Sequence, residues 1–258
     1  MSLDPDRLTA EFFRIPKLPH DPPTKDFLNR CQSHTVRVAG RFYKYYQCGS
    51  GPTVLHVHGV RSNLGSMAPI AETLLEQGYQ VVLFDAPAHG EALGESTDPI
   101  EVRDVIRGVA GRFDELHAVI GHSLGGLWTL AACDGGIRPR AVVSISAPST
   151  MRFLLEKFAE FFALDDAQQR AVADRISGRL GAEVWTELSP VEVVPALGVP
   201  GLVLHGEKDD YVPPENAERL HAGWPGSQLE FVDGAGHFDI VALPRVRTRI
   251  ADYLHAVG

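Results

Sequence analysis

Short apolar segments alternate with helical patterns along most of the chain, and this alternation restricts the possible fold more than any other feature. The apolar segments are rich in β-branched residues and show no polar face, as in strands whose sheet is covered on both sides. Helical patterns of about 10 to 15 residues separate them, which is typical of parallel strands joined by crossover helices. We therefore expect an α/β fold. The expected strands are 53–57, 80–84, 116–120, 141–145, 202–205 and 228–232, and the expected helices are 67–77, 99–113, 124–133, 214–223 and 244–256.

An antiparallel hairpin is expected before the alternating part. Val36 and Val38 alternate with polar residues, Ala39-Gly40 is typical of a turn, and the aromatic-rich run 42–46 favours a strand. With this hairpin the chain has eight expected strands, the first two antiparallel to each other. We therefore expect a mostly parallel eight-stranded sheet with helices on both faces.

Two segments do not follow the alternation. Residues 1–33 contain several closely spaced prolines, and we expect an irregular N-terminal arm there, ahead of a domain at 34–258. After the sixth strand the sequence contains only helical patterns, which predicts a small helical cap inserted at about 149–195. Its two helices are expected at 151–163 and 166–180. The first is amphipathic and rich in Phe, and this aromatic face either packs on the body or also lines a substrate pocket.

Net charge and cysteine content restrict the partners and the compartment. The 258 residues carry a formal net charge of −9, so nucleic acids and anionic membrane surfaces are not expected partners. Cys31, Cys48 and Cys133 show no paired spacing, so we expect no disulfide and a reducing compartment. Asp4 and Asp6 stand where a signal peptide has its basic region. We therefore expect a cytoplasmic protein.

The strongest local motif is Gly-His-Ser-Leu-Gly at 121–125, a G-x-S-x-G pattern. It follows the expected strand 116–120 and precedes the expected helix 124–133, which is the strand–turn–helix setting of a nucleophile elbow. The two glycines remove Cβ atoms that would clash where backbones approach closely at a sharp turn. The motif predicts that Ser123 is a nucleophile presented at the end of the sheet.

A serine hydroxyl needs a neighbouring base to act as a nucleophile. Of the 11 histidines, His237 lies in a glycine-rich loop after the last expected strand, at the same sheet edge as the predicted elbow. His205 lies at a strand end, and His221 and His255 lie in expected helices, where a structural role explains them better. We therefore expect His237 to be the base.

The base in turn needs a carboxylate that orients its ring. Glu207, Asp209 and Asp210 all follow the seventh expected strand. Asp209 lies three residues after Gly206 and three before Val212, and its neighbour Asp210 should point in a different direction. The end of the sixth strand offers no carboxylate. We therefore expect Asp209 to be the orienting acid.

The tetrahedral intermediate of acyl transfer needs two N–H donors for its oxyanion. One is expected to be the backbone N–H of Leu124, directly after the serine. The other should come from the loop 58–61 after the third strand, and we expect the N–H of Val60.

The sequence offers little support for a metal site or a cofactor site. His56 and His58 have the spacing of a ligand pair, but no third ligand lies nearby, and strand alternation puts both on one buried face. The sequence has no glycine-rich phosphate loop of either common kind. We expect no metal and no cofactor.

From about residue 34 to its end the chain resembles the α/β-hydrolase superfamily, with the nucleophile, acid and base in the order Ser, Asp, His that this fold requires. Asp85 and His89, in the run 84–90, lie in a sequence similar to that superfamily's turn after strand four and are interpreted as structural or pocket-edge residues. The other motifs that carry the resemblance are 58–60, 121–125, 206–213 and 236–237.

The resemblance implies a serine hydrolase that acts on a small-molecule carboxylic ester. Ser123 would attack the ester carbonyl, and His237 would carry the proton. Asp209 would orient the ring of His237, and water would cleave the acyl-enzyme. The same residues could act on a thioester, an amide or a carbon–carbon bond next to a ketone. A non-catalytic binding protein is the remote alternative, and epoxide hydrolase or dehalogenase chemistry would need an aspartate in place of Ser123. The sequence leaves the oligomeric state open.

Overall fold

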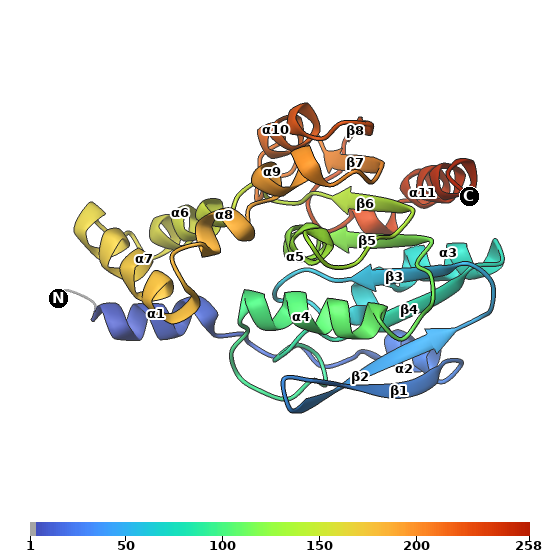
Figure 1. Ribbon diagram of the computed structural model, residues 1–258, viewed down its shortest axis with the longest axis horizontal. Helices are drawn as coiled ribbons and strands as arrows, with labels where there is room; N and C mark the ends of the chain where they lie inside the picture. The colour runs from blue at the N-terminus through green and yellow to red at the C-terminus, as the bar shows by residue number, and fades with distance from the viewer. Residues whose placement is uncertain (1–3) are drawn as a thin grey trace.

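The computed structural model describes residues 4–258 and contains an eight-stranded sheet in the order β1-β2-β4-β3-β5-β6-β7-β8 (Figure 1). β2 is antiparallel to both of its neighbours, β1 and β4, and all other neighbouring strands are parallel. The expected α/β class and the mostly parallel sheet are therefore confirmed. The strands are β1 (Gln32–Val38), β2 (Arg41–Cys48), β3 (Thr53–Val57), β4 (Gln80–Phe84), β5 (Ala118–His122), β6 (Ala141–Ile145), β7 (Gly201–Gly206) and β8 (Ser227–Val232).

Helices cover both faces of the sheet, which explains why its central strands have no polar face. In β3 the side chain of Val54 belongs to the apolar cluster beneath α3 and α11, whereas that of Leu55 belongs to the cluster beneath α4 and α5. Successive side chains of a strand point to opposite faces, so each face buries its own set. The covering helices are α3 (Ala68–Glu76), α4 (Pro99–Ala110), α5 (Leu124–Cys133), α10 (Glu215–Gly223) and α11 (Pro244–Ala256).

Between β6 and β7 the chain forms four helices; the first three lie to one side of the sheet, whereas the last packs against α5 and α10 (Figure 1). The two longer ones agree with the expected helical patterns, and α7 begins with a capping box between Asp165 and Gln168. Two further helices of one turn each were not expected. The four are α6 (Met151–Phe161), α7 (Asp166–Leu180), α8 (Val184–Glu187) and α9 (Pro190–Val193).

The N-terminal segment is not irregular, and that prediction was wrong. It forms α1 (Pro5–Phe13) and α2 (Pro22–Leu28). Each helix has an aspartate at its N-cap, Asp4 or Asp21, whose carboxylate accepts an N–H of the first turn, and each has proline directly after the cap. Asp followed by Pro is a helix-start signal, because the cap satisfies a free N–H and proline has none to lose.

Helix α1 packs against the helices inserted after β6 and lies beside α7 (Figure 1). The ring of Phe12 meets Phe158 of α6 edge to face, with the centroids 5.3 Å apart. The guanidinium of Arg179 in α7 lies over the ring of Phe13, 4.2 Å from its centroid. Helix α1 therefore adds a further helix to the group formed by the inserted helices.

A buried ion pair fixes the connection between α1 and α2 to the sheet. Nε2 of His20 lies 2.8 Å from Oδ2 of Asp85, and both residues are buried. The Asp85 carboxylate also accepts the N–H groups of Leu64 and Glu91, each at 3.0 Å. The hydrogen bond to Asp85 outweighs burial and raises the pKa of His20. Burial by itself raises the pKa of Asp85, but these hydrogen bonds and nearby charges hold it below its usual value.

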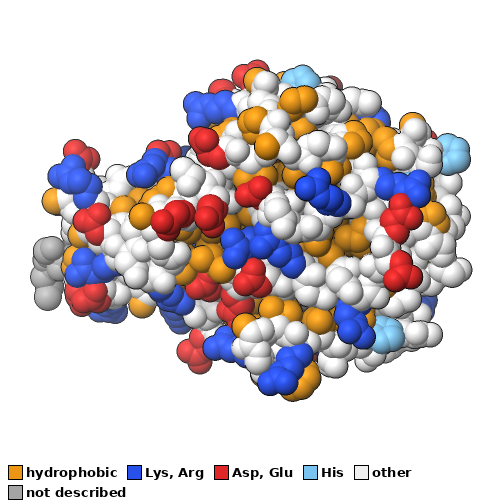
Figure 2. All heavy atoms as spheres, viewed as in Figure 1, with side chains coloured by type: hydrophobic (Ala, Val, Ile, Leu, Met, Phe, Trp, Pro, Cys, Tyr) orange, Lys and Arg blue, Asp and Glu red, His pale blue; other side chains and the backbone are white. Residues whose placement is uncertain are grey.

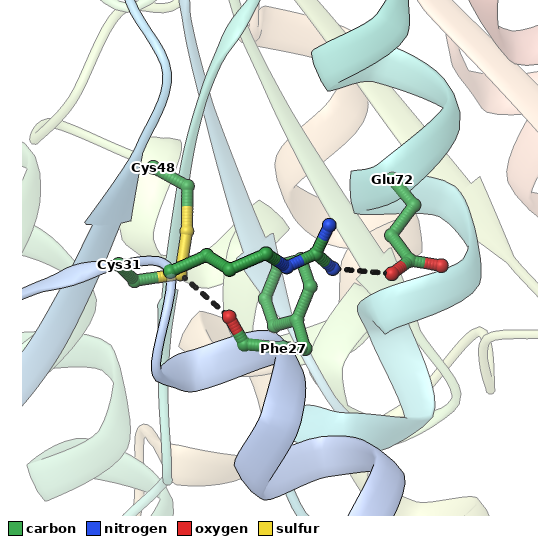
Figure 3. The surroundings of a disulfide bond; sticks show 5 residues. Phe27, Cys31, Cys48 and Glu72 are labelled. Carbon is green, nitrogen blue, oxygen red and sulfur yellow. Dashed lines mark hydrogen bonds and ion pairs between the residues drawn. A yellow bond between two sulfur atoms is a disulfide. The ribbon is translucent and has the colours of Figure 1, made fainter.

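The structure corrects the expectation of no disulfide, because Cys31 and Cys48 are bonded (Figure 3). The register of the hairpin pairs Gln32 with Gln47, which places the two cysteines one step further along the ladder, with their Cα atoms 4.6 Å apart. Spacing along the chain could not reveal this pairing. Because the chain has a disulfide, its cysteines no longer indicate a reducing compartment. The cytoplasmic location stays a prediction.

In the part of the chain from residue 4 to 258, no helix has both the length and the apolar character needed to cross a membrane. On the face shown in Figure 2, Lys and Arg side chains are interspersed with Asp and Glu side chains, and apolar atoms show between them. This face therefore carries no large patch of a single charge.

The His20–Asp85 pair predicts a pH-dependent contribution to stability. Because the pKa of His20 is raised above 6.5, its stabilisation is complete below pH 6.5 and is lost as the pH rises through the raised pKa. Because the pKa of Asp85 is lowered from 3.8, its contribution is present above pH 3.8 and is lost as the pH falls through the lowered pKa. His20→Gln should therefore reduce the free energy of unfolding by about 1.5–3 kcal/mol at pH 6 and by less at pH 9.

Urea unfolding of both proteins at the two pH values measures this difference. The matched control is His255→Gln, at an exposed position of α11, which should change stability little at either pH. An equal loss at pH 6 and pH 9 would contradict the role given to the charged His20.

Candidate active site

The residues predicted to carry chemistry lie in loops that meet at one edge of the sheet. Val60, Ser123, Asp209 and His237 follow β3, β5, β7 and β8, and parallel strands present their carboxyl ends on the same side. Nε2 of His237 lies 3.0 Å from Oγ of Ser123, and Nδ1 of His237 lies 2.7 Å from Oδ2 of Asp209. The structure thus brings the three predicted side chains into one hydrogen-bonded row, and all three residues are buried.

Ser123 occupies a strained turn between β5 and α5. Its φ of 54° and ψ of −128° are rare for a residue with a side chain. Its N–H donates to the carbonyl of Ile145 in β6 at 2.8 Å, which ties the turn to the neighbouring strand. A Cβ on Gly121 would strike the carbonyl of Gly125, and a Cβ on Gly125 would strike the carbonyl of Val57. Both glycines of the motif are therefore required by the packing.

The two oxygens of the Asp209 carboxylate have separate partners. Oδ1 accepts the N–H groups of Tyr211 at 3.0 Å and Val212 at 2.8 Å, which leaves Oδ2 for His237. Burial by itself raises the pKa of Asp209, but the hydrogen bonds from His237 and the Val212 N–H outweigh it and lower that pKa. The carboxylate is therefore ionised at neutral pH. Asp210, the neighbouring candidate, is exposed.

These contacts set the tautomer of His237. An ionised carboxylate can only accept a hydrogen bond, so Nδ1 of His237 must carry the proton that Asp209 accepts. Nε2 then has a free lone pair and accepts the hydroxyl proton of Ser123. The arrangement can remove a proton from the serine and return it to another atom.

His122, inside the pentapeptide, was assigned no role from the sequence, yet it contacts the loop that carries His237. Its Nε2 donates to the backbone carbonyl of His237 at 2.8 Å, and the two rings lie 5.0 Å apart. Burial lowers the pKa of His122 to about 3, so the ring is neutral. Nothing local in the sequence reveals this contact, because it joins residues 115 positions apart only after the sheet has formed.

His58 orients the peptide group that contains the N–H of Val60. Nε2 of His58 accepts the N–H of Ala86 at 2.9 Å, so its proton is on Nδ1, which donates to the carbonyl of Gly59 at 2.7 Å. That carbonyl and the Val60 N–H belong to the same planar peptide. Burial lowers the pKa of His58 to about 4 and keeps it neutral. A Cβ on Gly59 would lie 2.8 Å from Cβ of Ser123, so glycine lets this loop lie against the serine.

The second predicted donor, the N–H of Leu124, begins α5. The first N–H groups of a helix have no helical carbonyl to bond, so this one is available to an anion beside Ser123. The structure therefore places a hydroxyl beside a base. Acyl transfer also requires donors for the oxyanion, and the N–H groups of Val60 and Leu124 stay predicted for that role.

Other possible binding features lie apart from these residues. Among residues 4–258, His, Cys, Asp and Glu side chains form no group of three or more that could hold a metal ion. A cavity of about 620 Å³ lies between the β1–β2 hairpin and the start of α4, where Tyr43, Asp98 and Arg179 are among its lining residues. None of the residues that line it belongs to the predicted site.

Comparison with known proteins agrees with the fold and the motifs. Residues 54–248 match a family described as the alpha/beta hydrolase family. The protein is therefore a hydrolase of the α/β class, as the motifs led us to expect. The chain belongs to the alpha/beta hydrolase family.

Three similar proteins illustrate the relationship. The uncharacterized hydrolase YugF of Bacillus subtilis (strain 168) is 25% identical over 264 residues, which cover 85% of this chain and 96% of YugF. A pimeloyl-[acyl-carrier protein] methyl ester esterase of Xanthomonas axonopodis pv. citri (strain 306) is 26% identical over 228 residues, covering 73% of this chain and 89% of that protein. The solved structure of the Pyrococcus furiosus esterase Pf2001 has a TM-score of 0.74 at 20% identity and covers 95% of this chain and 100% of that chain. This structural likeness shows the shared fold.

The contacts of Asp209 predict a large difference between two neighbouring substitutions. Asp209→Asn puts an amide beside His237 that can donate to Nδ1 and so favour the wrong tautomer. The rate at which a fluorophosphonate labels Ser123 should fall by about 10⁴-fold. Asp210→Asn, at an exposed position, should change that rate less than about twofold. A larger loss for Asp210→Asn would contradict the assignment of the acid.

Proposed function

We propose that this protein is a serine esterase that hydrolyses carboxylic esters of small molecules through an acyl-enzyme. The observation that carries the proposal is the hydrogen-bonded row from Ser123 through His237 to Asp209. The N–H groups of Val60 and Leu124 are the proposed oxyanion donors. The two similar proteins whose names include esterase activity support the choice of an ester.

The first half of the proposed reaction forms the acyl-enzyme. Oγ of Ser123 attacks the carbonyl carbon of the ester, and its proton passes to Nε2 of His237. The N–H groups of Val60 and Leu124 stabilise the oxyanion of the tetrahedral intermediate, each by a factor of about 10²–10³ in rate. The carbon–oxygen bond to the alcohol then breaks, and Nε2 gives its proton to the departing alkoxide.

The second half returns the enzyme to its starting state. Water takes the place of the alcohol, gives a proton to Nε2 of His237, and attacks the acyl carbon. The tetrahedral intermediate collapses, Oγ of Ser123 regains the proton, and a carboxylic acid leaves. Asp209 remains ionised throughout and stabilises the imidazolium in both halves.

The proposal predicts loss of activity on substitution of the nucleophile. Ser123→Ala should abolish fluorophosphonate labelling and reduce hydrolysis of p-nitrophenyl esters by at least about 10⁴-fold, because it removes the hydroxyl that is hydrogen-bonded to Nε2 of His237. Within a series from acetate to palmitate, short or medium acyl groups should be preferred. Ser50→Ala, at an exposed turn after β2, is the matched control and should leave both readouts unchanged.

Two results would contradict the proposal in different ways. Labelling that survives Ser123→Ala would show that another residue is the nucleophile. Labelling of Ser123 without turnover of any oxygen ester would show that the nucleophile is correct and the bond is not, and would move the assignment to thioesters, amides or carbon–carbon bonds.

A further inference from the structure

Two exposed aromatic side chains cover the ring of His237. Tyr211 is 62% exposed and Phe238 is 57% exposed, although large apolar side chains of the central strands are buried. The ring centroids of Tyr211 and Phe238 lie 5.5 and 4.9 Å from that of His237, and 4.9 Å from each other. The ring of the buried His122 also lies near, with its centroid 5.0 Å from that of His237. His237 is therefore buried itself but is in contact with an aromatic pair that reaches the surface.

The backbone fixes this aromatic pair relative to the residues proposed to react. The N–H of Tyr211 donates to Oδ1 of Asp209 at 3.0 Å, and Phe238 follows His237 directly in the chain. The two rings are therefore held at the proposed base. Single exposed apolar residues are common on proteins. Tyr211 and Phe238 instead contact each other and together offer apolar surface, beside the proposed base, that a bound group can bury.

The proposed reaction defines which part of an ester would lie beside Tyr211 and Phe238. The alkoxide oxygen receives its proton from Nε2 of His237, so it must come within about 3 Å of that atom. The group attached to this oxygen then lies beside the His237 ring. The carbonyl oxygen, by contrast, lies toward Val60 and Leu124, where Leu124, Trp128 and Met151 belong to a buried apolar cluster.

The charges next to the pair restrict the alcohol further. Asp210 precedes Tyr211 and Asp239 follows Phe238, and both carboxylate residues are exposed. An anionic alcohol placed over the rings would be repelled by these two charges. An uncharged aromatic or alkyl alcohol would bury apolar surface on the rings without that repulsion.

We propose that Tyr211 and Phe238 form the subsite for the alcohol part of the substrate, and that this alcohol is uncharged and aromatic or alkyl. This inference rests on the proposed esterase function and adds to it the chemical class of the leaving group. Tyr211 and Phe238 are specificity-determining residues in this account, while the proton transfer belongs to His237.

The test compares acetate esters that differ only in the alcohol. The substrates are phenyl acetate, benzyl acetate, ethyl acetate and the anionic 4-acetoxybenzoate. Tyr211→Ala and Phe238→Ala should each lower kcat/KM about tenfold for phenyl and benzyl acetate and less than about twofold for ethyl acetate. Each variant is compared with the unchanged protein on the same ester, so the intrinsic reactivity of the leaving group cancels. The unchanged protein should prefer phenyl acetate to 4-acetoxybenzoate, and Asp210→Asn combined with Asp239→Asn should reduce that preference.

The control for the aromatic variants is Phe42→Ala, because Phe42 is 69% exposed on the β1–β2 hairpin. It should leave all four rates unchanged. Labelling with a small fluorophosphonate has fluoride rather than an alcohol as the leaving group, so its rate reports the state of Ser123 and His237 alone. It should be unchanged in both aromatic variants.

Three results would overturn the subsite. An equal loss on all esters together with slower labelling would show that the rings only hold His237 in place. The p-nitrophenyl ester series from acetate to palmitate holds the alcohol constant, and a loss that grows with acyl length in that series would place the acyl group on the rings. Unchanged kinetics in both variants would show that the rings do not contact substrate. Failure of the esterase proposal is distinguishable, because the unchanged protein would then hydrolyse none of these esters.

Discussion

The sharp turn at Ser123 is the constraint on which the rest of the site depends. A positive φ at a serine is unfavourable, and it persists here because β5 and α5 are both buried and the serine N–H is bonded to β6. The turn also requires that three backbone segments approach one another without Cβ atoms. Gly121 and Gly125 meet this requirement within the elbow, and Gly59 meets it on the neighbouring loop. The parallel sheet supplies the remaining condition, because it delivers the loops of the proposed acid and base to the same edge.

Neutral buried histidines support this geometry through the backbone. His58 orients the peptide of Val60, and His122 holds the carbonyl of His237. In both residues burial lowers the pKa far enough that the ring stays neutral near pH 7, so each keeps a defined donor and acceptor. His20 is different, because it meets the carboxylate of Asp85 and its pKa is raised. The same residue type therefore serves as a neutral backbone support in two places and as the hydrogen-bond partner of a buried carboxylate in a third.

The sequence predicted the parts of the structure that depend on local patterns. The sheet follows from apolar runs that need cover on both faces, and α5, α7 and α11 begin and end where the periodicity does. Three of the site loops were predictable because a nucleophile, an acid and a base each need a particular residue type at the end of a parallel strand. The loop 58–61 was predicted from its place after the third strand, since its proposed donor is a backbone N–H that any residue except proline carries. The structure brings Ser123, Asp209 and His237 together in the expected order.

The parts that escaped prediction depend on contacts between distant positions or on a signal that was overlooked. The helices of the N-terminal segment could have been found, since Asp4-Pro5 and Asp21-Pro22 are start signals. The pairing of Cys31 with Cys48 depends on the register of a hairpin, and a shift of one residue would separate the two. His20 and His122 contact partners 65 and 115 positions away, so no local pattern marks them.

The central step of the proposed reaction is a covalent bond between Ser123 and the acyl group of a substrate. The measurement is mass spectrometry of the protein after acid quench during the first turnover of a p-nitrophenyl ester, followed by peptide mapping. The account predicts a mass increase equal to one acyl group, located on the peptide that contains Ser123 and lost as deacylation proceeds. An acyl group on any other residue, or hydrolysis with no acylated protein at any time, would contradict it.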